Sequence, residues 1–240
     1  MKTTLPLTPW EPFESSSRSL RWCRDLKTMK LRYALLLGAI LSWMVMLPFM
    51  DGDFLGVSIP HLVGIITVVF AIAATTETRN AVYLATACGI VSLALNAQRS
   101  GYLRETSIAL DIGLLAFASY CILGFVFSGR IVTSETLRAA VCLYLFLGIG
   151  FACAYYLGSL AIPNAVLHDN VPARKMSEMI YLSFATLTTL GYGDIRPNIS
   201  VLRSLAILEG ISGQLFLTLL VARLVGLHIT AQSPAEGSRH

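Results

Sequence analysis

Six long stretches of the chain carry few charges, and they constrain the fold more than any other feature of the sequence. They are residues 33–50, 57–74, 81–98, 106–128, 137–160 and 201–228. A helix of about 20 apolar residues is long enough to cross the hydrocarbon core of a bilayer. Only 13% of the 240 residues are charged, whereas soluble domains carry about 25%. The sequence therefore predicts an all-α membrane protein with six transmembrane helices.

A run of basic residues precedes the first of these stretches. It consists of Arg18, Arg21, Arg24, Lys27 and Lys30. Basic residues next to transmembrane helices stay mainly in the cytoplasm. We therefore expect a multi-pass protein of the plasma membrane with both termini in the cytoplasm. The run also suits binding to anionic lipid headgroups, although a topology signal without a regulatory role explains it equally well.

A short hydroxyl-rich segment and a glycine motif lie between the last two apolar stretches. Residues 176–188 are too few to cross a bilayer, so we expect a re-entrant helix. The motif Thr189-Leu190-Gly191-Tyr192-Gly193-Asp194 follows it directly. Glycine adopts backbone angles that a Cβ forbids in other residues. A tight turn in an extracellular loop would also contain such glycines, but the preceding helix and the spanning helix on each side argue against it.

This arrangement resembles the pore domain of the potassium channel family. Residues 137–228, a bit over a third of the chain, are similar to its outer helix, pore helix, selectivity filter and inner helix. In that family the backbone carbonyls and the threonine hydroxyl of Thr189–Gly193 would replace the water around K⁺. The resemblance implies a homotetramer that conducts K⁺ passively, without a cofactor. Leu190 stands where valine is commoner, and its side chain would point away from the ions.

The resemblance also gives roles to residues around the motif. Tyr181 occupies the position of an aromatic residue that donates a hydrogen bond to the filter aspartate, here Asp194. The alternative is a tyrosine that only packs among apolar neighbours. Gly213 lies 19 residues after Asp194, where many relatives bend the inner helix. Gly210 and Gly213 would equally provide a smooth surface for a neighbouring helix.

The inner segment contains the residues expected to line an aqueous cavity. Gln214 and Thr218 are four residues apart and therefore share one face of a helix. The resemblance directs this face toward the cavity beneath the filter. Val221 and Val225 continue it toward the cytoplasm, where apolar side chains close a pore by dewetting.

Two acidic residues lie inside apolar stretches. An ionised Glu209 would be costly near the middle of the membrane. We expect it to face away from the pore and to meet pore-helix hydroxyls such as Ser183 or Thr186, in its protonated form. A neutral glutamate that serves packing alone remains the alternative. Asp111 is nearer the outer end of its helix, within reach of Arg104 or water.

The first four helices, residues 33–128, resemble a voltage-sensor module in number only. A sensor's fourth helix carries an arginine at every third position, but Thr106–Ser128 contains neither Arg nor Lys. Because no charge would move through the electric field, we expect little voltage dependence. Residues 1–32 would form a cytoplasmic segment, and 229–240 a cytoplasmic tail too short for a ligand-binding gating domain. The gating stimulus stays open.

Three other functions fit parts of the sequence. A weakly selective cation channel is the closest, but Tyr192 and Gly193 argue for the full set of carbonyl layers. A potassium transporter would carry four pore-like repeats in one chain, and only one is found here. An enzyme or receptor would need a metal-ligand set, a nucleophile with its base or a phosphate-binding loop, none of which the sequence indicates. We expect no enzymatic activity and no nucleic-acid partner.

Overall fold

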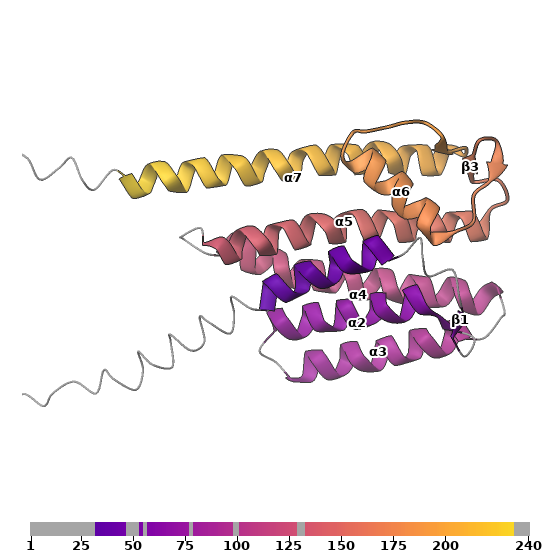
Figure 1. The fold of residues 1–240 in the computed structure, drawn as a ribbon, viewed down its shortest axis with the longest axis horizontal. Helices are drawn as coiled ribbons and strands as arrows, with labels where there is room; N and C mark the ends of the chain where they lie inside the picture. The colour runs from indigo at the N-terminus through magenta and orange to yellow at the C-terminus, as the bar shows by residue number, and fades with distance from the viewer. Residues whose placement is uncertain are drawn as a thin grey trace, which may run out of the picture.

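The computed structural model of the protein describes six parts of the chain. These are residues 32–46, 53–54, 57–76, 79–97, 101–128 and 133–232. The basic run from Arg18 to Lys30 and residues 233–240 lie outside them, so the lipid-binding prediction is not tested. Most described residues are helical (Figure 1).

Four helices pack side by side in one half of the molecule (Figure 1). They are the first helix (Arg32–Met46), α2 (Ile59–Thr75), α3 (Arg79–Ala97) and α4 (Gly101–Ser128). Tyr33 is buried and stacks on Phe125 of α4, with 4.9 Å between ring centroids. By length and composition α4 is a candidate membrane span, whereas the other three contain shorter apolar helices. The module of four helices thus has the predicted order, and its number of crossings stays a prediction.

The other half contains α5 (Ser134–Ala161), the short α6 (Met176–Leu187) and α7 (Ser200–Gln232). The chain runs directly from the end of α4 into α5, so these two helices are antiparallel and pack along each other (Figure 1). Thr133 caps α5, because its hydroxyl accepts a hydrogen bond from the Thr136 N–H at 3.4 Å. Both α5 and α7 are long and apolar enough to span a membrane.

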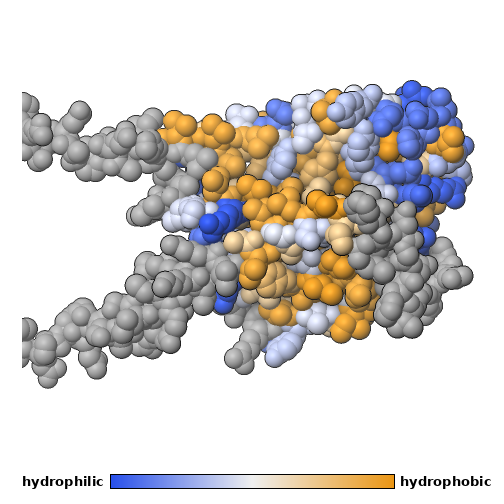
Figure 2. All heavy atoms as spheres, in the orientation of Figure 1, coloured by the Kyte–Doolittle hydropathy of each residue, from blue (hydrophilic) through white to orange (hydrophobic). Residues whose placement is uncertain are grey.

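The surface of the molecule is divided into an apolar band and a polar end. Figure 2 shows apolar side chains over the middle of the helices and hydrophilic ones at the end that carries the loops around α6. Helix α7 lies at the edge of the bundle (Figure 1). Only 11% of the residues in its most apolar stretch are buried, against 56% for α5. A single chain therefore leaves most of the apolar surface of α7 uncovered.

Short strands at the polar end were not predicted, although the described residues are mostly helical, as expected of an all-α membrane protein. Three of them form an antiparallel sheet in the order β4 (Val171–Pro172), β3 (Val166–His168) and β5 (Ile195–Pro197). Asp169 and Asn170 connect β3 to β4 with positive φ angles of 47° and 69°, which a two-residue hairpin turn requires. Strands of two or three residues are too short to show an alternating pattern, so they were not predicted. A second pair, β1 (Asp53–Phe54) and β2 (Val57–Ser58), precedes α2.

The observed helix boundaries differ from the predicted apolar stretches, most clearly in α4, α5 and α7. Helix α5 starts at Ser134 rather than at 137, and α7 continues to Gln232 rather than ending at 228. Helix α4 starts at Gly101, five residues before the predicted Thr106. It therefore includes Arg104 near its start, and the fourth helix is not free of arginine.

Candidate ion-conduction site

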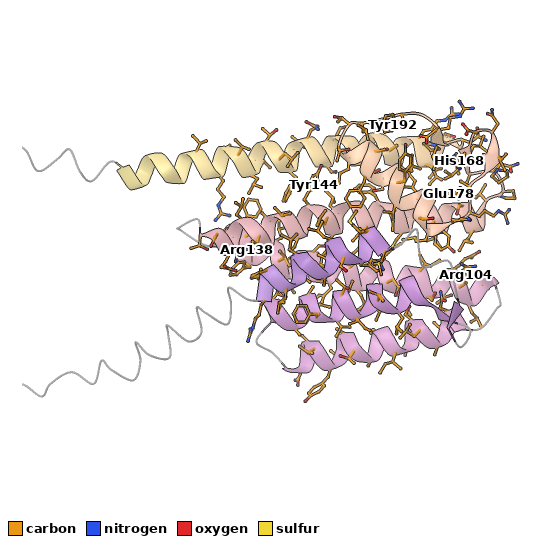
Figure 3. All side chains as sticks on the ribbon, viewed as in Figure 1. Arg104, Arg138, Tyr144, His168, Glu178 and Tyr192 are labelled. Carbon is orange, nitrogen blue, oxygen red and sulfur yellow. The ribbon has the colours of Figure 1, made fainter. Side chains whose placement is uncertain are left out.

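Helix α6 begins at the polar end of the molecule (Figure 1), and its start is held by Glu178. One carboxylate oxygen of Glu178 accepts hydrogen bonds from the backbone N–H groups of Arg174 (3.0 Å) and Lys175 (2.9 Å). The other carboxylate oxygen lies 3.1 Å from Nδ1 of His168. Figure 3 labels both side chains. Partial burial raises the pKa of Glu178, but the hydrogen bonds from Lys175, His168 and Arg174 outweigh this effect and keep the pKa below its ordinary value.

The chain turns sharply where α6 ends. The carbonyl oxygen of Ala185 accepts hydrogen bonds from the N–H groups of Leu190 (2.8 Å) and Gly191 (3.1 Å). The Thr189 N–H bonds to the carbonyl of Thr186 at 3.0 Å. These bonds direct the N–H groups at the start of the motif toward the helix end.

The backbone of the motif alternates between two conformations. Thr189, Gly191 and Gly193 have positive φ angles of 61°, 55° and 82°, whereas the φ angles of Leu190 and Tyr192 between them are not positive. Successive residues whose φ angles alternate in sign gather their backbone N–H groups on one side, as in backbone anion nests, and their carbonyl groups then face the other side. Two of the three left-handed positions are glycines, which adopt this conformation without a Cβ penalty. The motif can therefore present several carbonyl groups on one side.

Two hydrogen bonds support the outer end of the motif at Asp194. Tyr181 Oη donates to Asp194 Oδ1 at 3.2 Å, so the predicted contact is present. The Asp169 N–H donates to the carbonyl oxygen of Asp194 at 3.1 Å. This second contact comes from the β3–β4 turn, and nothing in the local sequence indicated it. The strand β5 starts directly after Asp194, so the sheet and the motif form one unit.

Gly213 lies against the end of α6. A Cβ at this position would lie 2.9 Å from the carbonyl oxygen of Leu187 and 2.8 Å from its Cδ1. At Gly210 a Cβ would meet nothing within 4 Å in this chain. Helix α7 is continuous through both residues. The structure thus explains Gly213 by close helix packing, the alternative left open by the sequence, and the hinge stays a prediction.

Glu209 is fully buried where α5, α6 and α7 meet. Its Oε2 accepts a hydrogen bond from Tyr155 Oη at 2.7 Å. Its Oε1 is hydrogen-bonded to Ser183 Oγ, which is also 2.7 Å from the carbonyl oxygen of Gly148. Ser183 was a predicted partner, whereas the Thr186 hydroxyl bonds to Leu182 within its own helix. Tyr155 was not among the predicted partners.

The predicted cavity residues lie on the exposed surface of α7. Gln214 and Thr218 are exposed, and the Thr218 hydroxyl donates to the Gln214 carbonyl at 2.7 Å. Val221 and Val225 are exposed by 57% and 52%. Gly213, in contrast, is buried against α6. The four residues are thus available to an aqueous cavity or to another subunit.

Asp111 has partners other than those expected. Its Oδ2 lies 2.6 Å from Nε2 of His61 on α2, and Ser92 Oγ of α3 donates to its Oδ1 at 2.6 Å. Arg104 does not reach it, because the Arg104 guanidinium donates to Tyr156 Oη and lies over the Tyr156 ring at 5.5 Å. Of the two expected partners, Arg104 or water, Arg104 is bound elsewhere, and His61 and Ser92 contact Asp111 instead.

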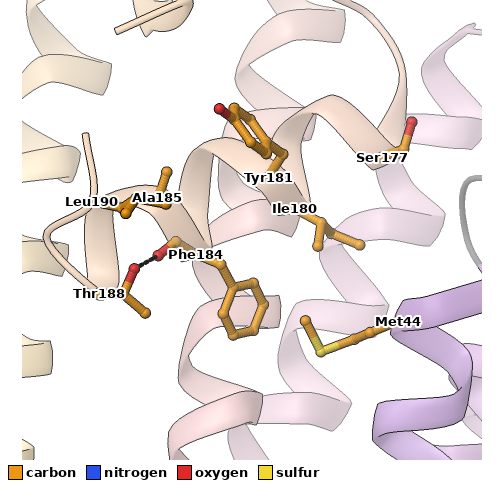
Figure 4. A pocket seen from close by; sticks show the side chains of 8 residues that line it. All are labelled: Met44, Ser177, Ile180, Tyr181, Phe184, Ala185, Thr188 and Leu190. Carbon is orange, nitrogen blue, oxygen red and sulfur yellow. Dashed lines mark hydrogen bonds between the residues drawn. The ribbon is translucent and has the colours of Figure 1, made fainter. Parts of the chain in front are cut away.

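A pocket of about 280 Å³ lies beside α6 (Figure 4). Its lining comes from the first helix, α6 and the motif, and consists of Met44, Ser177, Ile180, Tyr181, Phe184, Ala185, Thr188 and Leu190. None of these side chains carries a charge at neutral pH, so the pocket offers no charged ligand to a cation.

Comparison with known proteins gives one match. Residues 157–228 match a family model described as an ion channel. They run from the end of α5 through α6 and the motif into α7, and make up less than a third of the chain. Together with the apolar helices, this match indicates an integral membrane protein with an ion-channel domain. No curated protein and no solved structure matches the chain.

Proposed function

We propose that this chain is one subunit of a potassium-selective channel. The observation that carries the proposal is the alternating backbone of Thr189–Gly193 directly after the end of α6. K⁺ must lose its water to pass a narrow pore, and successive carbonyl oxygens on one side of the chain replace that water. The threonine hydroxyl adds one more oxygen layer. Catalysis and a cofactor have no part in this mechanism, and K⁺ is the permeant ion.

The proposed channel is a homotetramer. One chain provides one filter strand, and four strands are needed to surround an ion. The uncovered apolar surface of α7 supports this assembly, because side chains such as Ile207 (65% exposed) and Leu215 (55%) would otherwise lack partners other than lipid. In this assembly Gln214 and Thr218 line the cavity, and Val221 and Val225 form its cytoplasmic end.

The proposed topology has six crossings of the plasma membrane and cytoplasmic termini. Figure 1 is compatible with it, since the start of the first helix and the end of α7 lie at the same end of the bundle, opposite the sheet. Tyr181 and Asp194 then support the extracellular end of the filter.

Reversal potentials measured across a bilayer with asymmetric K⁺ and Na⁺ test the selectivity. The potential should follow the K⁺ gradient, and Ba²⁺ should block the current. Tyr192→Asp should abolish the preference for K⁺. Tyr192→Phe is the matched control, since it keeps the ring and the backbone, and should retain the preference. Equal permeability in the unmodified protein would support a weakly selective cation channel instead.

Native mass measurement of the purified protein tests the assembly. The active species should have four times the mass of the 26.1 kDa chain. A monomer or dimer with full activity would contradict the tetramer.

A further inference from the structure

Arg223 connects α7 to the end of α4, 97 residues earlier in the chain. Its guanidinium donates a hydrogen bond to the carbonyl oxygen of Val126 and lies 5.1 Å from the centroid of the Phe127 ring. Elsewhere α7 packs mainly against α5 and α6. Arg223 therefore joins the inner helix directly to the four-helix module.

The end of α4 is a suitable place for an arginine. The last four carbonyl groups of a helix have no partner within the helix, and Val126 is in this position because α4 ends at Ser128. The C-terminal end of a helix also carries partial negative charge, which a cation stabilises. A guanidinium provides a donor for the carbonyl and a flat face for the Phe127 ring.

Arg223 and the proposed pore-lining valines lie on opposite sides of α7. At 100° per residue, Arg223 is about 160° from both Val221 and Val225 around the helix. These valines are exposed, while Arg223 is half-buried against α4. A movement of the valines would therefore change the distance between the Arg223 guanidinium and Val126.

We propose that Arg223 is a positioning residue that couples the end of α7 to the four-helix module and stabilises the non-conducting state. This rests on the proposed channel function. In the structure the Arg223 guanidinium is bound to Val126 while α7 is unbroken through Gly213. If the channel opens by a bend of the inner helix at Gly213, the unbroken helix is the closed form. Opening by a bend at Gly213 would withdraw the guanidinium from Val126. The four-helix module thereby influences opening without sensing voltage.

Single-channel recording of the full-length tetramer tests the proposal. Arg223→Met keeps a long side chain on Phe127 but removes the charge and the donors, and should raise the open probability roughly ten-fold, as expected for loss of one charge-assisted hydrogen bond. Arg223→Lys should rescue part of this effect. Arg203→Met is the matched control, since Arg203 lies on the same helix and also donates to a backbone carbonyl, that of Pro197 at 3.3 Å. Its open probability should not change.

Two outcomes would overturn the proposal. One is an unchanged open probability in Arg223→Met tetramers. The other is an equal increase in Arg203→Met, which would indicate a general effect of removing a charge from α7. If Arg223→Met does not assemble, Phe127→Leu removes the ring contact alone and should give a smaller increase, whereas no increase would reject the link.

Failure of the coupling is distinguishable from failure of the channel function. Open probability is measured independently of which cation carries the current, so loss of K⁺ selectivity would leave this test intact. If no current flows at all, hydrogen exchange of the tetramer in micelles gives a second measurement. Arg223→Met should then speed exchange at the ends of both α4 and α7, and faster exchange in α7 alone would reject the coupling.

Discussion

The single hydroxyl hydrogen of Ser183 has two oxygen neighbours, the carbonyl of Gly148 and Oε1 of Glu209. It can be donated to only one of them. If it is donated to Gly148, Glu209 Oε1 must carry a proton and donate it to Ser183 Oγ. Tyr155 then donates to Oε2, and every member of the network has a partner. A neutral Glu209 satisfies this network, and an ionised Glu209 satisfies it if Ser183 donates to Oε1 instead, so the protonated form stays a prediction.

Glu209→Gln tests this arrangement. A glutamine amide can donate to Ser183 and accept from Tyr155, so the melting temperature of the protein should change little. Glu209→Leu leaves the hydroxyl groups of both neighbours without this partner, which costs about 1–3 kcal/mol per buried group, and should lower the melting temperature clearly. Thermal unfolding in detergent measures both. A large loss in Glu209→Gln would mean that the carboxylate is ionised.

At the scale of helices, Gly213 allows α7 to approach the end of α6 closely. Gly213→Ala would place a methyl group 2.9 Å from the backbone oxygen of Leu187, so α6 and the motif after it must shift. Gly210→Ala meets nothing within 4 Å in the chain and gains helix propensity of up to about 1 kcal/mol. We expect Gly213→Ala to lower both the melting temperature and the open probability, and Gly210→Ala to lower neither. Equal behaviour of the two variants would remove the packing role.

The outer end of α6 should weaken in acid. The pKa of Glu178 is lower in the folded protein than in the unfolded chain. Its stabilising contribution is therefore present above the unfolded pKa of about 4.3 and is lost as the pH falls through the lower folded value. Melting temperatures measured below pH 5 should fall more steeply in the unmodified protein than in Glu178→Gln. Identical pH profiles would show that Glu178 does not contribute.

For the whole molecule, the charge of α4 bears on its response to voltage. Arg104 is its only basic residue, and it is bound to Tyr156 of α5 near the start of the helix. One anchored charge gains little from the field, at about 2.3 kcal/mol per charge per 100 mV for a full crossing. Open probability should therefore vary weakly over a range of about −100 to +100 mV, which is the scale of physiological membrane potentials. A slope equivalent to several charges per channel would contradict this.

Local sequence patterns predicted the helices and the position of the motif. Apolar length predicted the order of the helices in the described residues, because a membrane helix satisfies its backbone groups within one segment. The glycines of the motif permit the positive φ angles found at Gly191 and Gly193, and the resemblance to the potassium channel family implied the hydrogen bond between Tyr181 and Asp194. These features depend on residues close together in the chain.

Contacts between residues that are distant in the sequence depend on the packing of the helices. Tyr155 is 54 residues from Glu209, His61 is 50 from Asp111 and Arg223 is 97 from Val126. Each contact depends on which helices are neighbours and on their rotation, which a helical period does not specify. The sequence left the role of Gly213 open between a hinge and close packing, and it did not predict the sheet next to Asp194. Both features depend on the same long-range packing. The residues around Gly213 do not indicate that the carbonyl oxygen of Leu187, in another helix, lies close to it.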